Sequence, residues 1–196
     1  MKGTEKLTHA LKEWSAVVDA LGNGIQAVLL RKYPPTHQKF FLYPTYMFSI
    51  HKNYLSSYFQ PNYHDFVKNS VKLKQKGRTV IHYYAEVNEV IKIKRTDFEK
   101  LRNLRNYYIW SLNHIFNYFK DEKIKEAYIW VLKIYKIPEP QLINDLRSGA
   151  LKYAKLLINI PTRGGTPVMD NQRFLSTISE IKQHLEQPTS CRATLP

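Results

Sequence analysis

The sequence has a single cysteine, Cys191, among its 196 residues. One thiol excludes an internal disulfide framework, and its place in a polar segment with no folding pattern argues against a catalytic thiol. Long apolar runs are also missing. No stretch approaches the roughly 18 apolar residues of a transmembrane helix, and no charged start followed by an apolar core marks a signal peptide. We therefore expect a cytoplasmic protein with no membrane partner.

Acidic residues are scarce. The chain has 16 Asp and Glu against 30 Lys and Arg, which gives a formal net charge of +14 and an isoelectric point near 9.7. Such a charge creates a long-range field that attracts polyanions, nucleic acid above all. The alternative is that a lysine-rich surface serves solubility alone, so the charge by itself does not identify a nucleic-acid-binding protein.

Apolar residues are sufficient for a core, since 43% of the chain is hydrophobic and 13% aromatic. We expect one α+β domain over residues 1–186 and a disordered tail over residues 187–196, which lack apolar periodicity. No internal repeat or low-complexity linker divides the chain.

The N-terminal region predicts a helix, a turn and a strand. Apolar residues recur every three or four positions over residues 7–21, which is typical of an amphipathic helix. Gly22 and Gly24 then allow a reversal, and the apolar run 25–30 predicts a buried strand. Arg31 and Lys32 follow this strand directly, and two cations at a strand end favour an anionic ligand.

The remaining elements follow from similar patterns. In the long β-rich run over residues 78–94, the alternation of apolar and polar residues shifts by one position near Asn88, which predicts a bulge. Thr96 and Glu99 have the spacing of a capping box, and Asp170 is a plausible helix cap. We expect strands over residues 39–46, 78–94, 127–135 and 156–160. The first of these could pair with the strand at 25–30, and Pro138 and Pro140 would end the third. We expect helices over residues 63–71, 101–119 and 174–185.

Several residues are candidates for contacts with nucleic acid. A basic run without acids, which includes Lys74, Lys76 and Arg78, suits a phosphate backbone, because each neutralised phosphate releases counterions. Tyrosine rings near it can stack on unpaired bases, although most serve the core. In Thr162-Arg163-Gly164-Gly165, consecutive glycines permit backbone amides to converge on an anion beside the arginine. The alternative for this loop is a tight turn between two elements.

Catalytic and metal-binding patterns are weak. The seven histidines form no close pair, so no zinc site and no cofactor is predicted. The acids at Glu86 and Glu89 miss the spacing of a metal-dependent nuclease core. Glu86 alone is a candidate general base if it points into a pocket, and otherwise a solvated strand residue.

Four ordered motifs resemble domain-of-unknown-function family 1802 of bacteria and archaea. They are Leu11-Lys-Glu-Trp14, Leu29-Leu-Arg-Lys32, Phe41-Leu-Tyr-Pro-Thr-Tyr46 and Pro161-Thr-Arg-Gly-Gly-Thr-Pro-Val168. The resemblance covers nearly the whole chain and implies no particular chemistry.

Residues 14–31 also resemble the opening of PUA-like domains, including ASCH domains, in which a helix and a glycine-containing turn precede a strand that ends in arginine. This resemblance implies a PUA-like small mixed β-barrel with flanking helices and binding of RNA or modified bases. A few ASCH proteins hydrolyse a modified nucleoside with a Lys, a Thr and a Glu. Glu86 matches that Glu, but Gly24, Ile25 and Gln26 stand where the Lys and Thr are expected.

The leading hypothesis is a non-enzymatic protein that binds RNA or single-stranded DNA. In this hypothesis, Lys12, Arg31, Lys32 and Arg163 bind phosphates at one mouth of the expected barrel, and Tyr43 or Tyr46 offers a stacking surface. The alternatives are a nucleic-acid or nucleoside hydrolase or nuclease that uses Glu86, and a protein-interaction subunit with an acidic partner. The many tyrosines would also suit the interface of a homo-oligomer.

Overall fold

The computed structural model describes residues 7–72, 77–146 and 152–187. Within them, one sheet has the strand order β2-β5-β4-β3-β1-β6, and β7 pairs with β5. The strands are β1 (His9–Trp14), β2 (Val28–Arg31), β3 (Lys39–Thr45), β4 (Arg78–Lys94), β5 (Glu126–Asn144), β6 (Tyr153–Lys155) and β7 (Thr166–Pro167). The α+β class is confirmed. The predicted barrel is an open mixed sheet, because its described path ends at β2 and β6.

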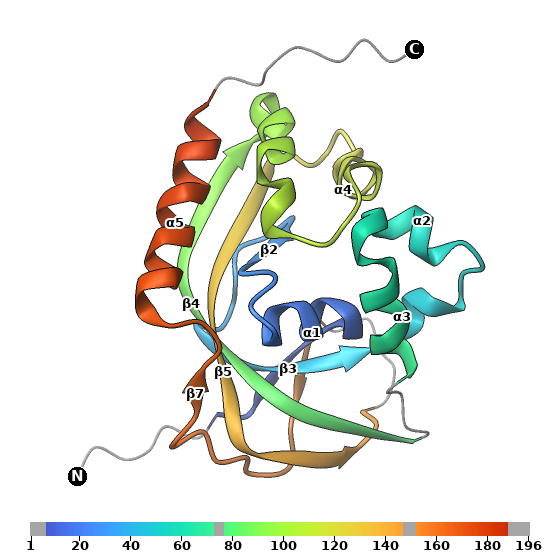
Figure 1. Ribbon diagram of the computed structural model, residues 1–196, viewed down its shortest axis with the longest axis vertical. Helices are drawn as coiled ribbons and strands as arrows, with labels where there is room; N and C mark the ends of the chain where they lie inside the picture. The colour runs from blue at the N-terminus through green and yellow to red at the C-terminus, as the bar shows by residue number, and fades with distance from the viewer. Residues whose placement is uncertain (1–6, 73–76, 147–151, 188–196) are drawn as a thin grey trace.

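Two long antiparallel strands, β4 and β5, run the length of the molecule (Figure 1). Their register shifts between Val87 and Glu89, which confirms the bulge predicted near Asn88. The prediction that Pro138 and Pro140 end the second strand is wrong. Both prolines lie where the register jumps a second time, so their missing amide hydrogens interrupt no regular ladder.

The N-terminal prediction is partly wrong, because the expected helix over 7–21 is a strand followed by a shorter helix, α1 (Ser15–Gly22). Ala10 and Leu11 pair in parallel with β3, and this sheet pairing overrides the helical spacing of the apolar residues. The strand expected at 25–30 is β2. It pairs with β5 and not with the strand at residues 39–45.

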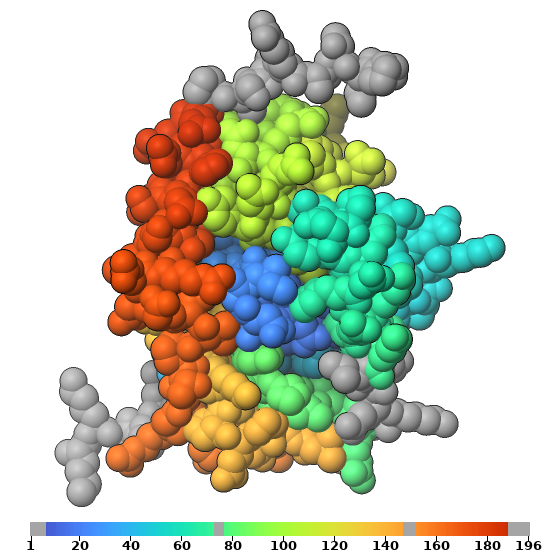
Figure 2. Space-filling model, viewed as in Figure 1, coloured from blue at the N-terminus to red at the C-terminus, as the bar shows by residue number. Residues whose placement is uncertain are grey.

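The other helices flank the sheet, with α5 along one side and α2, α3 and α4 near the other (Figures 1 and 2). They are α2 (Tyr54–Tyr58), α3 (His64–Lys72), α4 (Leu112–Phe119) and α5 (Asn171–Glu186), with 3-10 helices η1 (Met47–Ile50), η2 (Pro61–Tyr63) and η3 (Arg95–Tyr107). The predicted helices over 63–71 and 174–185 are thereby confirmed. The carboxylate of Asp170 accepts a hydrogen bond from the Arg173 amide at 2.8 Å, as a cap does.

The predicted helix over 101–119 is instead η3 and α4, separated by residues 108–111. No side chain caps η3, so the capping box predicted at Thr96 is not formed. The hydroxyl of Ser111 caps α4 by accepting from the His114 amide at 3.1 Å. The extended run predicted at 156–160 contains no strand, since β6 ends just before it.

Apolar residues fill both faces of β3. Phe40 and Leu42 join the main core, whereas Phe41 and Tyr43 join a smaller cluster on the other face. β1 pairs in parallel with one edge of β3. No helix in the described ranges has the length and apolar character that crossing a bilayer requires.

Candidate functional site

A pocket of about 270 Å³ lies where β1 and β2 end, beside α4. Three of the residues that line it are cationic: Lys12, Arg31 and Lys152. Six have aromatic or imidazole rings: Trp14, Tyr33, Trp110, His114, Tyr118 and Phe119. Its volume is just below the usual range for sites of drug-sized ligands, so it suits one small ring system.

A buried ion pair closes one wall of the pocket. The Arg31 guanidinium, on a residue 9% exposed, donates to the carboxylate of Glu13, which is 7% exposed. The second Glu13 oxygen accepts from the Trp14 amide at 2.8 Å, and the Thr45 hydroxyl donates to the Glu13 carbonyl at 2.9 Å. These bonds join the ends of β1, β2 and β3 into one fixed frame.

Arg31 lies against an aromatic floor. Its guanidinium carbon is 5.8 Å from the centroid of a Trp130 ring, and one of its nitrogens donates to the Leu30 carbonyl at 2.9 Å. Burial lowers the pKa of Arg31, with a partly opposing effect from Tyr118 and Tyr33. An arginine starts from so high a pKa that the guanidinium stays charged at neutral pH.

Two lysines lie over tyrosine rings beside Arg31. Lys152 Nζ is 2.9 Å from the Tyr33 ring centroid, and Lys32 Nζ is 4.3 Å from that of Tyr118. Burial, together with the charge of Arg31, lowers the pKa of Lys152. Burial raises the pKa of both tyrosines, which are therefore neutral at pH 7. The pocket thus presents positive charges against neutral rings.

Trp14 belongs to a wall of packed rings. Its ring centroid is 5.2 Å from that of Phe48, 5.1 Å from that of Tyr58 and 5.1 Å from that of His114. Rings at these separations support one another, so the Trp14 ring is fixed before any ligand arrives. A fixed ring costs little conformational entropy when it stacks on a planar ligand.

His114 is neutral at physiological pH, because burial lowers the pKa of this histidine from 6.5 to about 4. Its neutral form is the one that the fold favours, so stability is lost as the pH falls from about 6.5 toward 4, by roughly 3 kcal/mol in all. Urea unfolding at pH 7 and pH 4.5 tests this. The His114→Phe variant keeps a ring but cannot titrate, and it should lose less stability over the same interval; an equal loss would contradict the prediction.

The structure brings together some of the predicted binding residues. Lys12 and Arg31 line the pocket, and Lys32 is at its edge over Tyr118. Tyr43 is 5% exposed in the smaller core, and its hydroxyl accepts from the Leu146 amide at 3.0 Å. It therefore offers no ring face for stacking, contrary to the prediction. Tyr46 is half-buried after β3 and does not line the pocket.

The glycine-containing loop lies away from this pocket. Gly164 has a φ of 82°, and the Gly165 amide donates to the Thr162 carbonyl at 3.1 Å. A Cβ on Gly165 would come within 2.8 Å of the Tyr84 ring. These glycines form a tight turn, and the anion-binding role of the loop stays a prediction. Arg163 is exposed and lines a different cleft.

The other predicted residues also lie outside the pocket. Arg78 is exposed at the start of β4, and Lys74 and Lys76 fall outside the described residues. Glu86 is 38% exposed on its side chain and forms an ion pair with Lys39 at 2.8 Å. Glu86 therefore matches the alternative of a solvated strand residue and does not point into the pocket, as a general base would. Among the described residues, no group of three or more His, Cys, Asp and Glu could hold a metal ion.

Sequence reasoning missed most of the residues that line the pocket, among them Trp14 as a ring wall, Tyr33, His114, Tyr118 and Lys152. Trp14 was assigned to the core stripe of a helix that does not form. His114 and Tyr118 are four residues apart on α4, which places them on one helix face, but no local pattern shows that this face meets β1. Lys152 carries no signal in the sequence.

The fold and the pocket define an α+β protein with a cationic, aromatic-lined site. The chain belongs to the family described as Domain of unknown function (DUF1802), whose model matches residues 10–180. No curated protein matches it. It is similar to the crystal structure of an ASCH protein from Zymomonas mobilis, with a TM-score of 0.44 and 11% identity over 87% of this chain and 93% of the other. A mutant of that protein gives a TM-score of 0.45 and 11% identity, over 87% and 94% of the two chains.

Proposed function

We propose that this protein binds single-stranded nucleic acid, RNA or single-stranded DNA, with one unpaired base in the pocket. The observation that carries the proposal is the convergence of Lys12, Arg31 and Lys152 with fixed aromatic rings around one small cavity. Rings stack on bases of any sequence, and lysines hold the phosphates on either side. The net charge of +14 adds attraction at long range.

Each part of the pocket has a role in this proposal. Trp14 and His114, whose rings are 5.1 Å apart and neutral at pH 7, form the stacking wall. Arg31 is occupied by Glu13, so the pair presents a donor and an acceptor to the polar edge of a base. Lys12 and Lys152 come from neighbouring segments joined by a backbone hydrogen bond of 2.9 Å, and both serve the phosphates.

A single strand fits the pocket better than a duplex. A base can enter a cavity of about 270 Å³ only when it is unstacked and unpaired, and duplexes pay for such extrusion. The position of Glu86 adds no support to the hydrolase alternative, because Glu86 pairs with Lys39 at 2.8 Å and does not line the pocket.

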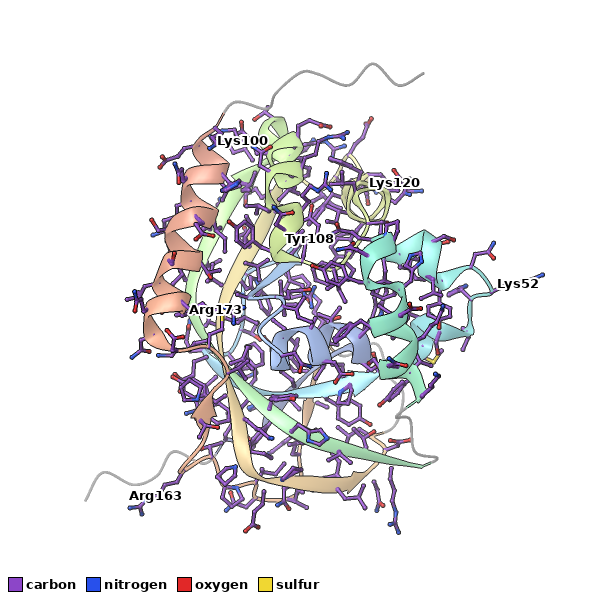
Figure 3. The ribbon with its side chains drawn as sticks, viewed as in Figure 1. Lys52, Lys100, Tyr108, Lys120, Arg163 and Arg173 are labelled. Carbon is purple, nitrogen blue, oxygen red and sulfur yellow. The ribbon has the colours of Figure 1, made fainter. Side chains whose placement is uncertain are left out.

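The double variant Lys12→Gln/Lys152→Gln tests the proposal. We expect it to bind a labelled single-stranded RNA about tenfold more weakly at low salt, and the slope of log affinity against log salt to fall by about 1.4. Fluorescence anisotropy at several salt concentrations measures both quantities. The matched control is Lys100→Gln/Lys182→Gln, which removes two charges from η3 and α5 at residues that do not line the pocket (Figure 3 labels Lys100).

Equal weakening by the two double variants would mean that only net charge matters, and it would refute the pocket as the binding site. Absence of binding by the unchanged protein at low salt would refute nucleic-acid binding itself. Preference for duplex over single-stranded probes would contradict the role of an unpaired base.

A further inference from the structure

A second and larger cleft, of about 1050 Å³, opens at the start of β1. It is lined by two histidines, His9 and His37, by the cations Lys39 and Arg163, and by hydroxyls including those of Thr36 and Thr162. No Asp or Glu is among its described lining residues. We infer that this cleft is an anion site, separate from the pocket, that takes a phosphate group and binds it more tightly at acidic pH.

The two histidines in the lining of the cleft contact each other. Their ring centroids are 3.9 Å apart at an interplanar angle of 20°, so the rings are stacked. His9 is the first residue of β1, and His37 lies on the loop that leads into β3. Two stacked imidazoles cannot both be protonated without strong repulsion. A bound anion removes that repulsion, so binding the anion and binding protons favour each other.

Arg163 supplies the permanent charge. It is exposed at the lower edge of the molecule in Figure 3, on the turn in which Gly164 adopts its positive φ. Lys39 contributes less, because Glu86 already pairs with it at 2.8 Å. An arginine near a group of hydroxyls is suited to a phosphate, which accepts two parallel hydrogen bonds from one guanidinium.

Among the described residues that line the cleft, no acidic group would hold the histidines protonated without a ligand. The Tyr153 ring meets His37 edge-on at 4.8 Å, and Lys155 is the partner of His9 in the β1–β6 register. Burial lowers the pKa of His37, and the neighbouring charge of His9 lowers it further. Anion binding raises this pKa, so affinity should fall as the pH rises from 5.5 toward 8.

The cleft and the pocket occupy opposite ends of β1. His9 lines the cleft, whereas Lys12, Glu13 and Trp14 line the pocket. The two sets of lining residues have no member in common, so a variant of one site leaves the other intact. The inference therefore stands or falls independently of base binding in the pocket.

An NMR titration of the histidine ring signals with sulfate tests the inference. Sulfate has the shape of phosphate and a constant charge between pH 5.5 and pH 8. We expect it to shift the signals of His9 and His37, with an affinity at least fivefold higher at pH 5.5. Arg163→Gln should weaken binding at least fivefold at both pH values, and the double variant His9→Gln/His37→Gln should abolish the pH dependence.

The control is Lys12→Gln/Lys152→Gln, which should bind sulfate in the cleft as the unchanged protein does. Sulfate that leaves both histidine signals unmoved, or that binds Arg163→Gln equally well, would overturn the inference. The source of the phosphate is then found by measuring single-stranded RNA binding to Arg163→Gln. Weaker RNA binding would assign the cleft to the phosphates of a strand, and unchanged RNA binding would assign it to a free phosphorylated ligand.

Discussion

Replacement of Glu13 by Gln should lower the free energy of unfolding by about 3–5 kcal/mol, one of the two largest effects that we expect. The substitution keeps the size of the side chain but removes the charge that balances Arg31. Arg31 is only 9% exposed and has no other carboxylate as a salt-bridge partner among the described residues. A buried guanidinium without a counter-charge pays most of its desolvation cost. Urea unfolding monitored by tryptophan fluorescence measures the change.

The double variant Glu13→Leu/Arg31→Met separates the ion pair from the shape of the site. It removes both charges and leaves apolar groups of similar size, so it should recover much of the lost stability. A double variant that is as unstable as Glu13→Gln would show that hydrogen bonds to the β1 backbone, and not the unpaired charge, cause the loss. The double variant should nevertheless bind RNA poorly, because the pocket loses its donor and acceptor.

Replacement of Trp130 by Ala should lower the free energy of unfolding by about 3–5 kcal/mol, the second of the two largest effects. The substitution leaves a cavity where the largest fully buried side chain lies. Trp130 is 0% exposed and packs edge-on against Tyr33 and Phe40, with centroid distances of 5.7 and 6.3 Å. Its indole nitrogen also donates to the Tyr33 carbonyl at 3.0 Å. Thermal and urea unfolding would both report the loss.

The Trp130→Phe variant is the informative control. It keeps an aromatic ring under Arg31 but cannot donate to the Tyr33 carbonyl, so its cost should be smaller, about 1–3 kcal/mol. A loss as large as that of Trp130→Ala would mean that the hydrogen bond matters more than the packed volume. Because Trp130→Phe should remain folded, its RNA affinity shows whether the position of Tyr33 matters for binding.

The sequence was a reliable guide where structure depends on neighbours along the chain. The strand from Lys39, the bulge near Asn88 and the helix capped by Asp170 all follow from local patterns, and the structure contains each of them. Residues 9–14 were assigned wrongly because their apolar spacing suits a helix, whereas pairing with β3 makes them a strand. That pairing joins residues about thirty positions apart, and no local pattern reports it.

The candidate site was predictable to a smaller extent. Arg31 was found because a cation directly after an apolar strand is visible in the sequence, and Lys12 because it flanks the apolar stripe of the helix expected there. His114, Tyr118 and Lys152 could not be found, since each reaches the pocket only through the packing of α4 and the chain before β6. Tyr43 was wrongly taken as a surface ring because alternation does not reveal that β3 is buried on both faces.

The position of β1 between two strands that pair with it fixes the distance between the pocket and the cleft. β1 is bonded to β3 on one side and to β6 on the other, and a slip of one residue would turn its apolar side chains to the wrong faces. Its two ends, one at each site, are therefore held at a constant separation of about 16 Å. If one strand occupies both sites, its phosphate in the cleft and its base in the pocket must lie about 16 Å apart.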